Sequence, residues 1–176
     1  MKNVLKLTLA VAFVMMSSSL FAQKFGRINT QEIVANMAET KEAQAQLETL
    51  ATDLQAQMES IQVEFNTKFQ EYQKSVATMS DAVKQMKEKE LTDIQNRLRD
   101  FEQMAQQDLQ KKQMELFQPI QEKAVNAINE VAKAGGYVFV YDVVTGAMAY
   151  IDEAAVTDLG PAVRAKLGIP EPAAAK

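Results

Sequence analysis

Carboxylates are the side chains whose types and spacing come nearest to those of a catalytic site. Glu88 and Glu90 lie two positions apart, and a pair of carboxyl groups can act as general acid and general base. These two residues stand in a lysine-rich stretch that is expected to be the surface of a helix, and no pocket is implied around them. We therefore interpret the pair as part of a solvated helix face.

The composition supports no other catalytic chemistry. The sequence contains no histidine and no cysteine, which excludes the usual zinc and copper ligands, the imidazole base and the thiolate nucleophile. Its 6 glycines form neither a phosphate-binding loop nor a dinucleotide-binding fingerprint. The sequence thus predicts a protein that is not an enzyme, uses no ATP, and has no catalytic, metal-binding or cofactor-binding residue.

Residues 1–22 have the pattern of a secretory signal peptide. Lys2 and Lys6 precede an apolar stretch from Leu7 to Met16, and the small residue Ala22 suits the position before a cleavage site. The apolar stretch is shorter than the roughly 18 residues that a membrane-spanning helix needs. Cleavage after Ala22 is therefore favoured over an uncleaved anchor, and we expect a soluble secreted chain.

The charge and the absence of cysteine limit the partners and the sources of stability. The net charge is −4, and loss of the signal peptide would make the chain more acidic, so we expect no nucleic acid partner. Disulfides cannot form without cysteine. In an oxidising compartment, stability must then come from packing or from association with other chains.

A long helical zone dominates the remaining chain. Residues 30–134 lack glycine and are rich in helix-forming residues, with a single interruption by serine and threonine. This pattern predicts helices over 38–76 and 83–133, with a tip at about 76–82. Together, residues 38–133 are expected to form an antiparallel coiled-coil hairpin arm.

The apolar positions of both helices recur with an eleven-residue period, or about 3.67 residues per turn, which favours a straight or slightly right-handed coil. The second helix shows this period from Leu98 through Leu109 to Ile120. Pro119 lies inside that helix, where we expect a kink. The apolar positions of the first helix are Leu47, Leu50, Leu54, Met58, Ile61, Phe65, Phe69, Tyr72 and Val76.

The end of the chain is punctuated by glycine and predicts strands. Residues 137–141 are aromatic and β-branched, and residues 147–151 follow across a turn, so we expect a β-hairpin. A last short helix is expected over 161–167, between a proline and a glycine. With the first strand, these elements would form a β-rich body from residues 23–37 and 134–169. Residues 170–176 are expected to be a frayed tail.

So few short strands cannot be stable alone, and their free edges would recruit other chains. We therefore expect the body to oligomerise, although the residues do not give the number of subunits. The strand residues expected at this interface are Phe25, Ile28, Val138, Val140, Met148 and Tyr150.

Two groups of side chains on the arm are candidates for binding partners. Met79, Met86, Met104 and Met114 lie at the tip or off the eleven-residue stripe, where flexible thioethers suit varied partners. Gap filling within the coiled coil is the equal alternative. A basic cluster at the tip could contact anionic lipid. Alternatively, it only makes the start of the second helix soluble. It consists of Lys84, Lys87 and Lys89.

The order of the expected elements is a signal peptide, a short strand, a long helical hairpin, further strands and a final helix. With this order, the chain resembles the Skp (OmpH-like) family of periplasmic chaperones. Residues 24–29 resemble the family's first strand, and the stretch from Pro119 to Asp142 resembles its most recognisable segment. Asp158-Leu159 and Lys166-Leu167-Gly168 complete the resemblance.

The resemblance implies an α+β fold in which helical arms extend from a β-strand body, assembled as a homotrimer in the periplasm. It further implies an ATP-independent holdase that shelters unfolded outer-membrane proteins in a cavity between the arms. Family members are often basic, so this acidic chain is expected to contact lipopolysaccharide or a membrane surface only weakly. The alternative function is a structural spacer or adaptor coiled coil of the cell envelope.

Overall fold

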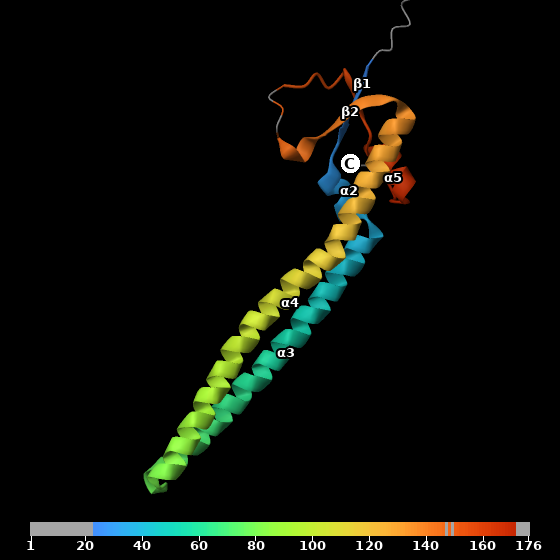
Figure 1. The fold of residues 1–176 in the computed structure, drawn as a ribbon. Coiled ribbons are helices and arrows are strands. Elements are labelled where there is room, and N and C mark those ends of the chain that lie inside the picture. The colour runs from blue at the N-terminus through green and yellow to red at the C-terminus, as the bar shows by residue number, and fades with distance from the viewer. Residues whose placement is uncertain (1–22, 147, 149, 172–176) are drawn as a thin grey trace, which may run out of the picture. The chain divides into compact units, whose positions relative to one another are not determined.

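The computed structural model describes residues 23–146, 148 and 150–171 (Figure 1). The chain divides into two compact units. One, here called the hairpin unit, runs from Val34 to Lys123; the other, the sheet unit, contains the residues up to Ile33 and from Ala124 onward. The expected signal peptide at residues 1–22 and most of the expected tail lie outside the described residues.

Two long helices form the hairpin unit, and both were expected from the sequence. Helix α3 spans Ala38–Ser75, a short 3-10 turn spans Val76–Thr78, and α4 spans Asp81–Gly135. Within this unit α3 and α4 lie side by side (Figure 1). Pro119 is an internal residue of α4, which continues on both sides of it, so a kink at this position stays a prediction.

The inner face of the hairpin follows the predicted apolar stripe with one exception. Leu54 on α3 and Ile94 on α4 are buried, and most other stripe positions are half-buried. Phe69, predicted to face inward, is 40% exposed and stacks on Phe65 with 5.9 Å between ring centroids. Lys68 is half-buried instead, because two successive steps of four residues from Ile61 rotate Phe69 by about 80° away from the inner face, whereas a step of four and then one of three leave Lys68 within about 20° of it.

The sheet unit is built on three parallel strands. β1 spans Lys24–Ile28, β2 spans Tyr137–Asp142 and β3 spans Val156–Asp158. The order is β2-β1-β3, and β1 pairs in parallel with both neighbours. Parallel neighbours need a long connection, and the chain between β1 and β2 provides it through α2 (Thr30–Asn36), α3 and α4.

The expected β-hairpin of residues 137–141 with 147–151 was wrong. β2 forms where it was predicted, but Met148, Tyr150 and Ile151 are in no strand, and β3 lies further along the chain. β2 ends at Asp142, whose Oδ1 accepts a hydrogen bond from Val144 N at 3.1 Å and turns the chain out of the sheet. The third strand then pairs with β1 instead of with β2.

The core of the sheet unit lies where β1, α2 and the last helix meet. That helix, α5, spans Gly160–Leu167, and its Val163 is 0% exposed, with Ile33 and Leu159 at 1%. A Cβ atom on Gly26 of β1 would lie 2.5 Å from Leu159 Cδ1, so only glycine fits without displacing this leucine. Just past the end of α4, Gly136 has a φ of 69°, a left-handed value that favours glycine.

Candidate functional site: the exposed apolar surface of the hairpin

Large apolar side chains are exposed along both helices of the hairpin unit. We call this set the hairpin apolar surface. Single exposed apolar residues are common on soluble proteins, whereas a contiguous patch of them marks an interaction surface. The six residues of this set are spread along the hairpin. They are Val63, Phe69, Val83, Met86, Met104 and Met114.

Three of the four methionines predicted to bind partners belong to this surface. Met86, Met104 and Met114 are exposed on α4, whereas Met79 is half-buried at the tip. Met86 and Met104 are separated by about five helical turns and therefore share one face of α4. Because these side chains do not fill the hairpin interior, the gap-filling alternative does not describe them, while their role in binding stays a prediction.

Ion pairs and hydrogen bonds join α3 to α4 beside the apolar stripe. Lys68 Nζ of α3 lies 2.7 Å from Glu90 Oε1 of α4, and within α4 Lys87 Nζ lies 3.1 Å from Glu90 Oε2. Hydrogen bonds from Lys68 and then Lys87 lower the pKa of Glu90, and the bond to Glu90 raises the pKa of Lys68. Tyr72 Oη donates to Glu88 Oε1 at 2.6 Å. Both carboxylates considered for acid and base chemistry thus connect the two helices.

Two further ion pairs join the helices of the hairpin unit away from the tip. Arg97 pairs with Glu64, and Lys123 pairs with Glu39. The hydrogen bond from Lys123 lowers the pKa of Glu39. The sequence did not predict the ion pairs between α3 and α4, because only the register between the two helices brings the partners together.

The predicted basic cluster at the tip is divided by the helix geometry. Lys84 and Lys87 share one face of α4, while Lys89 lies on another, given 3.6 residues per turn. Lys84 Nζ lies 3.9 Å from Asp81 Oδ1, and Lys87 is paired with Glu90. Two of the three positive charges are therefore partly neutralised, and contact of the cluster with a membrane surface stays a prediction.

The residues predicted at the oligomer interface occupy different environments in the sheet unit. Val138 of β2 is 60% exposed, and Val140 and Phe25 are half-buried. Phe25 contacts Phe139, with 5.1 Å between the ring centroids. Ile28 is buried inside the unit, and Met148 and Tyr150 are exposed but lie outside the strands. In the described sheet, β2 and β3 each pair only with β1, so their outer edges are free.

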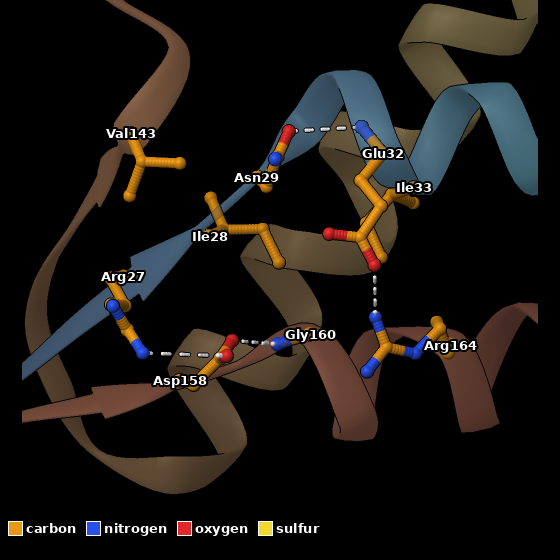
Figure 2. Close-up of a pocket in the computed structure, with 9 residues that line it drawn as sticks. All are labelled: Arg27, Ile28, Asn29, Glu32, Ile33, Val143, Asp158, Gly160 and Arg164. Carbon is orange, nitrogen blue, oxygen red and sulfur yellow. Dashed lines mark hydrogen bonds and ion pairs between the residues drawn. The ribbon is translucent and has the colours of Figure 1, made fainter. Parts of the chain in front are cut away.

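A cavity of about 230 Å³ lies within the sheet unit, and Figure 2 shows its lining. Arg164 Nη1 of α5 is 3.0 Å from Glu32 Oε1 of α2, and Asp158 Oδ1 accepts from Gly160 N at 2.8 Å at the start of α5 (Figure 2). Asn29 Oδ1 caps α2 by accepting from Glu32 N at 3.0 Å. These polar groups fix α2 and α5 to the strands. The spacing of Asn29 and Glu32, which lie three positions apart as in a typical helix N-cap, was the one feature of the sequence that indicated these polar contacts.

The described part of the chain holds neither a cluster of metal-ligating side chains nor a membrane-spanning helix. Within residues 23–146, 148 and 150–171, no group of three or more acidic side chains could hold a metal ion. Over the same residues, no helix is both long and apolar enough to cross a membrane.

The fold and the surface together define a class of protein: an α+β protein that contains a small parallel sheet and a long helical hairpin with exposed apolar side chains. The chain belongs to the family described as outer membrane protein (OmpH-like), whose profile matches residues 24–167. This confirms the resemblance stated from the sequence.

A solved structure has the same fold. It is described as a candidate outer membrane chaperone (OmpH-like) from Caulobacter crescentus CB15, with a TM-score of 0.71 and 15% sequence identity. The match covers 82% of this chain and 83% of the other. No curated protein matches this chain.

Proposed function

We propose that this protein is an ATP-independent holdase chaperone of the periplasm, which binds unfolded outer-membrane proteins and prevents their aggregation. The OmpH-like family is not a class of enzymes, and we propose no reaction. Holding requires only many weak contacts that form and break without an energy source. Export through a cleaved signal peptide, expected from residues 1–22, would deliver the chain to this compartment.

The observation that carries this proposal is the hairpin apolar surface. Met86, Met104 and Met114 are exposed on a helix whose interior positions are already filled by other apolar residues. Unbranched thioether side chains adapt to many partner shapes. Such contacts, spread along a long hairpin, suit an extended, unfolded polypeptide better than a compact ligand.

We further propose that the protein acts as a homotrimer whose hairpins enclose the client. The free edges of β2 and β3 and the exposed Val138 support association through the sheet unit. The subunit number comes from the family resemblance.

The test is light scattering of an unfolded outer-membrane β-barrel protein diluted from denaturant with and without the purified chain, in the absence of nucleotide. The mass of the protein is determined on the same sample. We expect aggregation to be suppressed at a fixed ratio of oligomer to client. A well-folded oligomer that leaves aggregation unchanged would instead favour the structural spacer of the cell envelope.

A further inference from the structure

We propose that Met86, Met104 and Met114 form an oxidative switch, at which a two-electron oxidant such as hydrogen peroxide lowers the affinity of the hairpin for clients. This inference rests on the proposed holdase function and adds a form of regulation to the same surface. The modification is conversion of each thioether to methionine sulfoxide.

Exposure separates these three methionines from the others in the hairpin unit. Met86, Met104 and Met114 are 60%, 49% and 64% exposed, whereas Met37 is 1% exposed. Met58 is half-buried. Because access of the oxidant to the sulfur controls the reaction, the three exposed residues should react first and Met37 last.

The chemistry needs no group beyond the side chain and the oxidant. The sulfur lone pair attacks one peroxide oxygen, the O–O bond breaks, and a proton transfer releases water. Sulfur is oxidised to the sulfoxide and the peroxide is reduced. Because the sequence contains no cysteine, no thiol of the chain competes for the oxidant.

The position of the three residues makes the change specific to binding. Oxidation replaces an apolar, flexible side chain by a polar one. The hairpin interior is packed by other positions of α4, such as the buried Leu91 and Ile94. A sulfoxide at Met86 or Met104 stays solvated, so the helix should remain folded while its apolar contact with a client is lost.

The first part of the test measures the order of oxidation in the intact purified protein. The chain is treated with increasing hydrogen peroxide, and peptide mass spectrometry counts the oxygen atoms added at each methionine. We expect Met86, Met104 and Met114 to be oxidised at doses that leave Met37 unmodified. Equal rates at Met37 and at the three exposed residues would overturn the assignment.

The second part measures client holding by the aggregation assay after oxidation. We expect a several-fold loss of holding with an unchanged circular dichroism spectrum. Treatment with methionine sulfoxide reductases A and B, one for each sulfoxide epimer, should restore holding. Full holding by protein that carries all three sulfoxides would overturn the proposal.

Leucine variants distinguish this switch from general oxidative damage. The triple variant Met86→Leu, Met104→Leu and Met114→Leu keeps the apolar surface, cannot form the sulfoxides, and should hold clients equally before and after peroxide. The control variant Met148→Leu, changed at a 46% exposed methionine of the sheet unit, should remain as sensitive as the unmodified sequence. The proposal is overturned if the triple variant loses holding to the same extent as the control.

Failure of the two proposals can be told apart. If the unoxidised protein holds no client, the holdase function is wrong and the regulatory inference falls with it, whatever the order of oxidation. If the unoxidised protein holds clients and its triply oxidised form holds them equally well, only the switch is wrong.

Discussion

Lys68 Nζ of α3 lies 2.7 Å from Glu90 Oε1 of α4, and this ion pair joins the two helices in the half of the hairpin nearer the tip. Glu90 also accepts from Lys87. The stripe there combines the half-buried Phe65 and Tyr72 of α3 with the buried Leu91 and Ile94 of α4. Charged and polar contacts therefore supplement apolar packing in this half.

The first prediction concerns acid. The pKa of Glu90 is lowered from its ordinary value of 4.5, so its contribution to stability is present above that value and is lost as the pH falls through the lower pKa of the folded state. The pKa of Lys68 is raised above 10.5, so the contribution of that group is lost only as the pH rises through this higher pKa. We expect Glu90→Gln to lower the melting temperature at neutral pH and to have little effect in strong acid.

Circular dichroism melts at neutral and acidic pH check this expectation. The control is Glu59→Gln, because Glu59 is an exposed carboxylate of α3 for which no ion pair occurs in the described part of the chain. An equal loss for Glu90→Gln at both pH values, or a matching loss for the control, would contradict a stabilising role of the pair.

The second prediction concerns the hairpin apolar surface. Changing Met86, Met104 and Met114 together to serine should weaken client holding and leave assembly intact, because these side chains are exposed and pack no interior. The aggregation assay and the mass in solution measure the two effects. Undiminished holding would remove these residues from the binding surface.

Each of these methionines follows an exposed glutamine, which provides a matched control. Changing Gln85, Gln103 and Gln113 together to serine alters neighbouring exposed positions of the same helix turns. This control variant should hold clients as well as the unchanged protein, since it removes no apolar side chain. A comparable loss in both variants would point to the helix itself and not to the methionines.

The third prediction concerns the core of the sheet unit. Leu159 is 1% exposed and lies against Gly26 of β1. Leu159→Ala should lower the free energy of unfolding by about 2–5 kcal/mol, the usual range for a buried leucine. Val125→Ala, at a 47% exposed position of α4, should change it by about 0.5 kcal/mol or less. Urea titration measures both, and similar values for the two variants would refute the assigned core.

The fourth prediction concerns assembly. Val138 is 60% exposed on β2, whose outer edge is free in the described sheet. A lysine at an edge strand disfavours pairing with another chain, so Val138→Lys should shift the oligomer toward monomer. Light scattering over a range of concentrations measures this shift. Val125→Lys, outside the sheet, is the control, and an unchanged mass for Val138→Lys would exclude this position from the interface.

The sequence by itself determined the helical hairpin. Glycine-free runs of helix-forming residues, one interruption near Val76, and an apolar period are local signals, and they predicted α3 and α4 to within a few residues. α4 ends two residues after the predicted residue 133, and Gly136, which follows it, has the left-handed φ that favours glycine whatever the surroundings.

The tertiary structure alone decided how the strands pair and which charges meet. β3 has three residues, too few for an alternating pattern to stand out, and its partner β1 lies far away in the sequence. Register between distant segments likewise decides that Lys68 lies on the inner face in place of Phe69. It also decides the Lys68–Glu90 and Arg164–Glu32 pairs. Such contacts form only when the chain has folded, because no local preference of either residue selects its partner.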